Sequence, residues 1–467
     1  MKFTYSWLKE HLETEHQYNE VVDKLTAIGL EVESVQDTGL AYKDFIVGQV
    51  LEEEKHPNAD KLKLCKVDIG REKVDVVCGA PNVTKGMKVV YAPVGCVIPV
   101  NQMKIKAAKI RGVESYGMMC SEYELGISNE HDGIISLEQD TEVGSSYADL
   151  SGMNDILIEI GITPNRQDCL GVLGVARDLA AAGVGKLKNR VFKTEKGSFE
   201  SPIKIEIQDN DMCPAFAGSY IKNVKNVASP DWLQKKLKSI GLRPISALVD
   251  ITNYVMFDQN RPLHVYDADQ VKGKIIVRSA QDGESFKALD EKTYDLKKGM
   301  CTISDEEKVL GLGGIMGGES TGCNFDTINV FLESALFDNV NTARTGRDLS
   351  ILSDARYRFE RGIDPRSTLE GIHYATQLIL EICGGECSEI VLAGQISETL
   401  NTIDILGKNI VKRLGLEITD DEIILILNSL GFGAKKNGKS IHCTIPPWRQ
   451  DIHGEADISE EIIRIKG

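Results

Sequence analysis

The chain has 467 residues, more than one hydrophobic core usually organises, so three or four domains are expected. Hydrophobic residues make up 42% and charged residues 27%, a balance that is ordinary for a soluble globular protein. The formal net charge of −16 argues against a general nucleic-acid binder, because phosphate contacts need clustered lysine and arginine side chains. Any nucleic-acid role must therefore come from a local basic patch.

The N-terminus and the cysteines indicate a cytoplasmic protein. The first residues contain no apolar run long enough for a signal peptide, and no apolar stretch reaches the roughly 18 residues that cross a bilayer. The 11 cysteines are scattered, which favours reduced thiols over a disulfide framework. Cys383 and Cys387 have no second pair of ligands nearby, so a loop at a helix end is a simpler interpretation than a zinc site. We expect no membrane partner.

In chain order, residues 1–38 are predicted to form a small α/β piece. Val21, Leu25 and Ile28 recur at helical spacing, and Gly29 is a suitable stop. Near Phe45 the pattern changes to short strands separated by glycine and proline turns. These strands are predicted over residues 45–51, 62–68, 74–78 and 88–92. Short strands at regular spacing are typical of a small β-barrel or sandwich.

Beyond residue 150, helices and strands mix again. A turn at residues 163–166 precedes a predicted helix over 175–182, and a strand is predicted over 203–207. Ser229 is predicted to cap a helix with Pro230 at its first position and Gly241 at its end. Residues 271–340 are rich in predicted strands. Two further helices are predicted, one ending at Gly384 and one over 423–430, which begins with a capping box of Thr419 and Glu422.

Two basic runs lie in the predicted barrel. Lys61, Lys63 and Lys66 have near-alternate positions on one strand, which would place them on one face. The second run holds four positive charges and no negative one, from Lys104, Lys106, Lys109 and Arg111. A five-stranded barrel with a basic face is how OB-folds bind nucleic acid. From charge alone, a solvated lysine face remains the simpler interpretation.

Four ordered motifs in this region favour nucleic-acid binding. They are residues 56–62 (HPNADKL), 78–82 (CGAPN), 111–122 (RGVESYGM and CSE) and 131–134 (HDGI). In this order they resemble the tRNA-binding OB domain that several aminoacyl-tRNA synthetases and their accessory proteins share. The resemblance implies that the seven basic residues of the two runs contact tRNA.

A second set of motifs narrows the resemblance to one family. The motifs are residues 252–256 (TNYVM), 261–267 (RPLHVYD), 311–318 (GLGGIMGG), 332–335 (LESA) and 353–362 (SDARYRFERG). Their order resembles the editing domain of the beta subunit of bacterial phenylalanyl-tRNA synthetase. Residues 163–166 (TPNR) also fit the N-terminal module of that subunit. Together the motifs extend the resemblance over essentially the whole chain.

The resemblance implies an α+β multidomain fold. An OB-fold β-barrel of residues 39–150 would be inserted into a small α/β domain formed by residues 1–38 and 151–200. A mixed α/β editing domain would follow over residues 201–395. A small C-terminal α/β domain with an acidic motif would span residues 396–467.

The chemistry of amino-acid selection explains why such a synthetase needs an editing site. Phenylalanine and tyrosine differ by one hydroxyl, and an apolar pocket rejects an analogue that merely adds a hydroxyl only on the order of a hundredfold. A second, hydrolytic site that binds the phenol can remove the error. Phenylalanine in that site would leave a buried polar group unpaired, which costs roughly 1–3 kcal/mol.

The family resemblance assigns roles to eight residues. Glu333 would bind the tyrosine hydroxyl, while Gly317 and Ala355 would form the small walls that admit the ring. The aminoacyl ester, the terminal adenosine and the attacking water would be held by Arg243, Thr252, Asn253, His264 and Ser353. Which of these, if any, is a general base stays open. Taken alone, His264 would be interpreted as a core histidine and Glu333 as an ion-pair partner. The assignment of their roles therefore depends on the whole ordered set of motifs.

The sequence departs from the family pattern at one loop. The family usually has glutamate at Asp258, Leu-Gly at residues 259–260 and glutamine at Arg261. Asparagine tolerates the left-handed conformation that glycine adopts, so Asn260 is expected to keep the turn. The altered loop is expected to affect the rim near His264.

The last predicted helix carries clustered carboxylates. Asp457, Glu460 and Glu461 lie at i, i+3 and i+4, on one helix face, an arrangement that suits Mg²⁺ or simply an acidic first turn. The family has Mg²⁺ ligands at these three positions and at Asp451, near the contact with the alpha subunit. The Mg²⁺ would be shared with the alpha subunit, which would bind ATP and carry out aminoacylation.

Three functions follow from these patterns. The first is the beta subunit of phenylalanine–tRNA ligase, which binds tRNA(Phe) and hydrolyses mischarged tyrosyl-tRNA(Phe) in an α2β2 heterotetramer. The alternatives are a free-standing trans-editing hydrolase and a non-catalytic tRNA-binding protein. The chain ends at Gly467, before the catalytic-like and anticodon-binding modules of the family, so we expect a truncated piece that does not aminoacylate alone.

Overall fold

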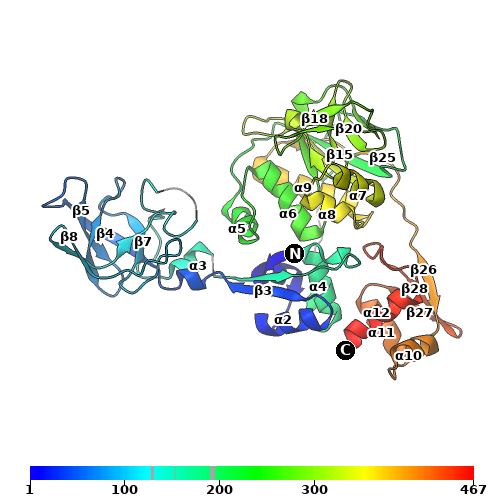
Figure 1. Cartoon of the computed structure of the whole chain (residues 1–467), viewed down its shortest axis with the longest axis horizontal. Helices are drawn as coiled ribbons and strands as arrows, with labels where there is room; N and C mark the ends of the chain where they lie inside the picture. The colour runs from blue at the N-terminus through cyan, green and yellow to red at the C-terminus, as the bar shows by residue number, and fades with distance from the viewer. Residues whose placement is uncertain (128–130, 153, 190–194) are drawn as a thin grey trace. The chain divides into compact units, whose positions relative to one another are not determined.

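The computed structural model describes residues 1–127, 131–152, 154–189 and 195–467. Their contacts divide the chain into two compact units, which are described separately below (Figure 1). One unit comprises Met1–Ser34 and Ile158–Gly467, and the other comprises Val35–Leu157. Runs of strands and groups of helices both occur along the chain, which confirms the mixed helix-and-strand character of the predicted α+β fold.

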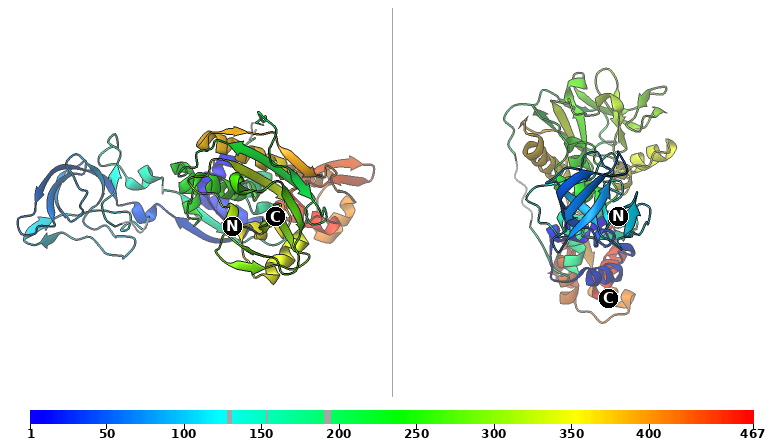
Figure 2. Two further views of the ribbon diagram at one scale, coloured as in Figure 1. Left: turned by 90° about the horizontal axis from the view of Figure 1, so that it is seen from above. Right: turned by 90° about the vertical axis from the view of Figure 1, so that its left-hand side faces the viewer.

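The Val35–Leu157 unit is built on one strongly curved sheet (Figure 2). Its strands run in the order β10-β7-β4-β5-β6, with β11 also paired to β7. Their bounds are β4 (Ile46–Lys55), β5 (Lys63–Asp68), β6 (Lys73–Cys78), β7 (Lys88–Ala92), β10 (Met118–Met119) and β11 (Ser136–Leu137). The four strands expected from the sequence are therefore present, and β4 extends further than predicted.

Contacts between the two ends of this sheet nearly close it into a barrel. The Tyr116 N–H donates to the Asp75 carbonyl at 2.9 Å, and the Val77 N–H donates to the Ser115 hydroxyl at 3.1 Å. These bonds join β6 to the segment that leads into β10. Alternate side chains of the strands fill the interior, including Val50, Val67 and Val89. The unit also contains β8 (Ala108–Ile110), β9 (Val113–Ser115) and α3 (Tyr147–Ser151).

The N-terminal part of the other unit is small. It contains β1 (Lys2–Thr4), α1 (Tyr5–His11), β2 (Leu12–Glu13), α2 (Tyr18–Ala27), α4 (Val172–Ala181) and β13 (Lys186–Leu187). Strands β3 (Val32–Asp37) and β12 (Ile156–Ile160) lead the chain out of this part and back into it. Helix α2 buries Val21 and Leu25 and is followed by Gly29 with φ +89°, as the spacing predicted. Helix α4 begins three residues before the predicted start.

Two five-stranded sheets form the centre of the fold of residues 201–395. The first sheet contains β14 (Ile205–Ile207), β17 (Ile275–Ser279), β20 (Cys301–Ser304), β21 (Val309–Leu312) and β22 (Met316–Gly317). The second contains β16 (His264–Asp267), β23 (Val330–Leu336), β15 (Ala215–Lys222), β24 (Glu386–Cys387) and β25 (Val391–Gly394). Side chains from both sheets share one core, in which Phe216, Ile303 and Phe331 are buried.

Helices cover the second sheet on its other face. Helix α9 (Ser367–Cys383) contacts β15 and β23, and α6 (Ala247–Gln259) packs on α9 (Figure 1). The remaining elements are α5 (Asp231–Ser239), α7 (Asn339–Asp348), α8 (Asp354–Phe359), and the hairpin of β18 (Ser285–Lys287) with β19 (Thr293–Asp295). The predicted role of Ser229 as the cap of α5 is wrong, because its hydroxyl binds the Asp250 carboxylate and Pro230 takes the cap position.

The C-terminal part combines three strands and three helices. The strands β26 (Thr402–Ile405), β28 (Ser440–Thr444) and β27 (Gly433–Asn437) pair in that order, beside α10 (Gly407–Leu414), α11 (Asp420–Ser429) and α12 (Glu455–Lys466). The capping box of Thr419 and Glu422 at the start of α11 is confirmed. No helix among the described residues has both the length and the apolar character that a transmembrane helix needs.

Candidate functional site

A cavity of about 400 Å³ opens beside the strands β16, β21, β22 and β23. Seven of the eight residues predicted for the editing pocket line it, namely Thr252, Asn253, His264, Gly317, Glu333, Ser353 and Ala355. The eighth, Arg243, is exposed and follows Leu242, which does line the cavity. Motifs as far apart in the chain as Thr252 and Ala355 therefore line the same cavity.

Strand pairing determines which side chains meet at Glu333. In the antiparallel pair of β16 with β23, His264 lies opposite Glu333, and Tyr266 lies opposite Phe331. Because side chains alternate along a strand, all four point to the same face. The Tyr266 hydroxyl donates a hydrogen bond to Oε2 of Glu333.

Burial controls the charge of Glu333. The side chain is only 5% exposed, and this burial raises the pKa of Glu333 to about 7, against a smaller opposing effect of the Tyr266 hydrogen bond. The carboxyl is therefore close to half protonated near neutral pH. A buried carboxyl at a cavity wall can bind a hydroxyl and is costly to leave unpaired.

His264 forms the neighbouring part of the wall. Its ring meets the Tyr266 ring edge-on, with centroids 4.4 Å apart, and its Nε2 is buried without a hydrogen-bond partner among the described residues. Burial lowers the pKa of His264 to about 4, so the imidazole is neutral at pH 7. The ring fits only because residue 317 is glycine, since a Cβ there would lie 2.2 Å from Cε1 of His264.

Backbone atoms hold the hydroxyl groups of Ser353 and Thr252. Ser353 caps α8, where its Oγ accepts from the Arg356 N–H at 3.1 Å and donates to the Ile315 carbonyl at 2.7 Å. Thr252 donates to the Val249 carbonyl at 2.7 Å. Among the residues that the structure describes, no histidine or carboxylate is hydrogen-bonded to either hydroxyl, as it would be in an activated nucleophile. Both residues are therefore better suited to positioning a ligand than to attacking it.

Sequence reasoning gave no role to Tyr266, although it lies in one of the quoted motifs. Its position two residues after His264 on a strand predicts that both side chains share a face. The partner strand, which supplies Glu333 from 67 residues further along the chain, could not be paired with it from the sequence.

The loop that departs from the family pattern packs away from the cavity. Asn260 has φ +56°, which confirms the expected left-handed turn. Asp258 is buried and accepts hydrogen bonds from Trp7 Nε1 at 2.8 Å and His11 Nε2 at 2.6 Å. The buried Arg261 donates to the carbonyls of Ala335 and Asp364 and to hydroxyls of α9. Residues 257–261 do not line the cavity, whose lining includes Met256 before this loop and Pro262 after it.

The first basic run does not form one face. Strand β5 begins at Lys63, so Lys61 lies before the strand. Lys63 has the same orientation as the buried Cys65, and its ammonium group binds the Glu53 carboxylate at 2.9 Å, whereas Lys66 points to the opposite side. The prediction that these lysines share a face is wrong, because a spacing of three residues reverses the side of a strand.

The second basic run is solvent-exposed. Lys104, Lys106, Lys109 and Arg111 all lie on the surface, with Lys109 on the short strand β8. Their exposure leaves them accessible to phosphate groups, as the sequence predicted. Contact with tRNA stays a prediction.

The four predicted Mg²⁺ ligands do not converge. Asp451 accepts two hydrogen bonds from Arg449, and the buried Glu461 is bound by Arg449 and Arg464. Asp457 accepts from backbone N–H groups at the start of its own helix, and Glu460 is exposed. As arranged, these carboxylates do not fit a cation site, because arginine already neutralises the buried ones. Mg²⁺ binding stays a prediction.

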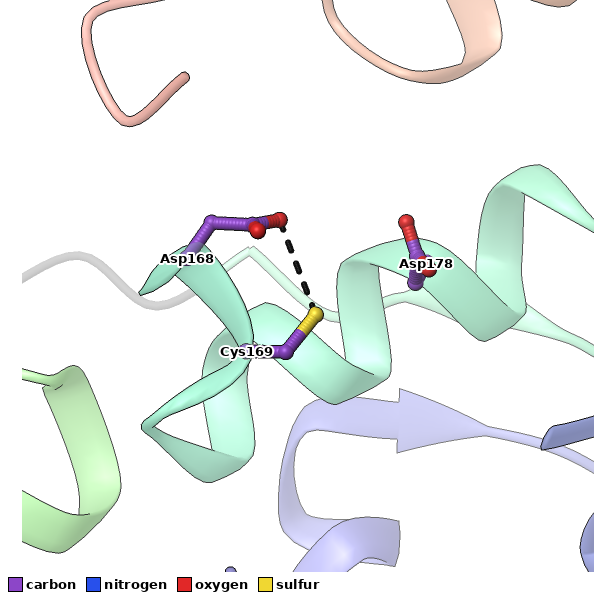
Figure 3. A group of neighbouring side chains, drawn as sticks. All are labelled: Asp168, Cys169 and Asp178. Carbon is purple, nitrogen blue, oxygen red and sulfur yellow. Dashed lines mark hydrogen bonds between the residues drawn. The ribbon is translucent and has the colours of Figure 1, made fainter. Parts of the chain in front are cut away.

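Three other potential metal ligands lie close together and are shown in Figure 3. Oxygen and sulfur atoms of Asp168, Cys169 and Asp178, which come from neighbouring segments, are within 4.8 Å of one another. However, Arg166 Nη2 lies 3.0 Å from both carboxylates, and Arg464 binds Asp178 with two hydrogen bonds. Nearby arginine charge holds the pKa of Asp168 well below its usual range. The cluster is an ion-pair network, and we assign no cation to it.

Three family models match separate stretches of the chain. Residues 45–146 match a putative tRNA binding domain, residues 212–384 match the B3/4 domain, and residues 403–467 match the tRNA synthetase B5 domain. The second match includes all eight residues that were predicted for the editing pocket.

Curated relatives match the chain from end to end. The beta subunit of phenylalanine–tRNA ligase from Rhodopseudomonas palustris is 50% identical over 469 residues, and that from Brucella melitensis is 51% identical over 471 residues. Each alignment covers 100% of this chain and 58% of the relative, so the chain spans a little over half the length of these proteins. A solved N-terminal fragment of the phenylalanyl-tRNA synthetase beta subunit from Pyrococcus horikoshii, 17% identical, covers 67% of this chain and 88% of the fragment, but its TM-score of 0.36 supports no argument.

Proposed function

This chain belongs to the family of phenylalanine–tRNA ligase beta subunits, of which it corresponds to the N-terminal part, and we propose that it hydrolyses tyrosyl-tRNA(Phe). The observation that carries the proposal is Glu333, a buried carboxyl on the wall of a 400 Å³ cavity lined by six other residues of the predicted editing pocket. A tyrosine side chain in this cavity would give Glu333 a hydroxyl partner. Phenylalanine would leave the same carboxyl without one.

The remaining residues of the cavity have roles that fit ester hydrolysis. Gly317 makes room for the His264 ring, whose neutral Nε2 is available to hydrogen-bond the attacking water or the ester. A nitrogen with a pKa of about 4 is a weak proton acceptor at pH 7, so His264 positions water rather than acting as a strong base. Ser353 and Thr252, held by the backbone, would contact the sugar or ester of the bound tRNA end.

The other proposed functions concern the barrel unit and the partners of the enzyme. The barrel unit, which matches a tRNA-binding model, would bind tRNA(Phe) through its exposed basic run. ATP-dependent aminoacylation would belong to the alpha subunit of an α2β2 heterotetramer. The family's Mg²⁺ would be shared with that subunit, but no step proposed here depends on it.

A deacylation experiment tests the proposal directly. Tyrosyl-tRNA(Phe) and phenylalanyl-tRNA(Phe) are mixed with excess chain under single-turnover conditions, so that weak tRNA affinity does not hide hydrolysis. We expect faster loss of the tyrosyl ester. Equal rates for the two esters would remove the proposed discrimination, and binding of tRNA without hydrolysis would favour the alternative of a non-catalytic tRNA-binding protein. A free-standing trans-editing hydrolase would also prefer the tyrosyl ester. In cells it would hydrolyse that ester without binding an alpha subunit.

A further inference from the structure

We propose that Tyr266 is a specificity-determining residue, whose hydroxyl holds one oxygen of the Glu333 carboxyl so that the other is presented to the hydroxyl of the substrate. The inference rests on the proposed function, because it concerns how the same cavity recognises tyrosine. Tyr266 is a positioning residue in this scheme, since it acts on the substrate through Glu333.

The geometry that carries the inference is the diagonal contact between β16 and β23. Tyr266 lies opposite Phe331, and Glu333 lies opposite His264, so the Tyr266 ring leans across the strand pair to reach Oε2 of Glu333. Tyr266 is 1% exposed, and its ring is fixed by His264 on one side and by the core shared by the two sheets on the other. A donor that is held this firmly restricts the rotation of the carboxyl group it binds.

The contact also places a phenol against the carboxyl that is proposed to recognise a phenol. The structure gives Glu333 one side-chain hydrogen bond among the described residues, at Oε2. A carboxyl group has two oxygens with lone pairs for about four hydrogen bonds, so Oε1 can accept the hydroxyl of a bound tyrosine at the same time. Tyr266 therefore directs the substrate to one oxygen.

The titratable groups around Glu333 make the contact measurable by pH. They are His264 and Tyr266 on β16, Cys213 before β15, and Cys301 on β20. Burial lowers the pKa of His264 to about 4 and raises that of Cys301 to about 12, and the pKa values of Tyr266 and Cys213 are raised well above their usual values. Between pH 5.5 and 8.5, Glu333 is the member of this group that changes charge.

Removing the hydroxyl of Tyr266 should therefore alter the pH dependence of discrimination. The hydrogen bond from Tyr266 lowers the pKa of Glu333, so in Tyr266→Phe that pKa rises. The loss of one hydrogen bond to a charged group corresponds to about one pKa unit. The protonated carboxyl is a weaker acceptor for a phenol, so tyrosine should lose its advantage over a wider pH range.

The experiment measures single-turnover hydrolysis of tyrosyl- and phenylalanyl-tRNA(Phe) by the whole chain from pH 5.5 to 8.5, with spontaneous hydrolysis subtracted. The quantity followed is the ratio of the two rates. For the unaltered chain we expect the ratio to rise with a midpoint near pH 7. For Tyr266→Phe we expect the midpoint to move up by about one unit, with a several-fold lower ratio at pH 7.

Tyr294→Phe is the matched control. The Tyr294 hydroxyl also donates to a carboxylate, Asp290, at 2.7 Å, but neither residue lines the cavity. This control should leave the ratio and its midpoint unchanged. A double-mutant cycle with Glu333→Gln is a second test, because removal of the Tyr266 hydroxyl should have no further effect on the ratio once Glu333 cannot ionise.

The outcomes separate the inference from the function on which it rests. If the unaltered chain does not prefer the tyrosyl ester, the proposed function fails. If it prefers tyrosine but Tyr266→Phe keeps the same midpoint and ratio, Tyr266 is only a structural residue and the inference is overturned. An additive effect of Tyr266→Phe in the Glu333→Gln background would overturn it as well.

Discussion

Glu333 and His264 face each other across neighbouring antiparallel strands, yet they do not form an ion pair. Burial raises the pKa of Glu333 to about 7 and lowers that of His264 to about 4, so the charged forms of the two groups do not coexist to any large extent. The wall of the cavity is therefore close to neutral below pH 7. Above pH 7 the Glu333 carboxylate is the charged acceptor for a tyrosine hydroxyl, while His264 stays neutral.

The first prediction concerns the carboxyl of Glu333. Glu333→Ala should lower the rate of tyrosyl-tRNA hydrolysis by one to two orders of magnitude, because a hydrogen bond to a charged group contributes roughly 1.5–3 kcal/mol. Hydrolysis of the phenylalanyl ester should fall less. The ratio of single-turnover rates is the measurement. An equal loss for both esters would mean that Glu333 acts on the ester or water instead.

The second prediction uses the tight fit at Gly317. A Cβ at this position would lie 2.2 Å from the His264 ring, so Gly317→Ala should displace the ring and reduce hydrolysis of both esters at least tenfold. Gly454→Ala is the control, because a Cβ there has no atom within 4 Å. Full activity in Gly317→Ala would show that the position of His264 is unimportant.

The third prediction is a pH effect on stability. Glu333 has a higher pKa in the folded chain, about 7, than its usual 4.5, so the folded state binds more protons and Glu333 destabilises the fold as pH rises through this range. His264 has the opposite effect between about pH 4 and 6.5. The stability of Glu333→Gln relative to the unaltered chain should therefore rise by on the order of 3 kcal/mol from pH 5 to pH 8. Urea unfolding of both proteins checks this, and a constant difference would contradict it.

The fourth prediction concerns the exposed basic run of the barrel. Replacing Lys104, Lys106 and Lys109 by alanine should weaken tRNA binding and flatten its dependence on salt, because fewer counterions are released. A matched triple variant at Lys55, Lys73 and Lys85, which are also exposed in this unit, should retain the salt dependence. Titrations at several salt concentrations measure the slope. Equal slopes for the two variants would indicate that the run is merely a solvated face.

The fifth prediction concerns Arg464. Arg464→Met should destabilise the fold by roughly 3–5 kcal/mol, because it leaves the buried carboxylates of Asp178 and Glu461 with too little positive charge. The control is Arg413→Met, which breaks a more exposed pair with Glu455 and should cost about 0–1 kcal/mol. Denaturant unfolding compares the two. Similar losses of unfolding free energy in the two variants would mean that burial does not make the ion pairs of Arg464 more important for stability.

Ordered motifs in the sequence located much of the candidate site, because the order of the segments that hold Glu333, Gly317 and Ser353 resembles that of a known family; the residue types alone would not have assigned these roles. The sequence also predicted several helices and strands, among them α2, α11 and the strands β4 to β7, since their apolar spacing and caps are local signals. It did not predict the contact of Tyr266 with Glu333, because the pairing of β16 with β23 depends on packing between distant segments.

Other features were missed for similar reasons. The acidic residues of α12 appeared to be a cation site, because nothing in their spacing reveals that Arg449 and Arg464 fold onto them. The common face predicted for Lys63 and Lys66 was wrong for a different reason, because a spacing of three residues places two side chains on opposite sides of a strand. Charge patterns give the residues available for an interaction but not their partners.

The ion-pair network has a consequence for how the modules of this chain can be exchanged. Arg464 near the C-terminal end neutralises Asp178 of α4, and Arg166 contacts the same carboxylate, so two segments almost 300 residues apart share one set of charges. Residues 403–467 match a family model of their own, which invites their transplantation between relatives. A chimera whose donor lacks a cation at position 464 would bury an incompletely neutralised Asp178 in the recipient. A chimera that takes both segments from the same donor should fold, because the paired charges are kept. A chimera that takes only one segment should fold only when the donor and the recipient have the same charges at these positions.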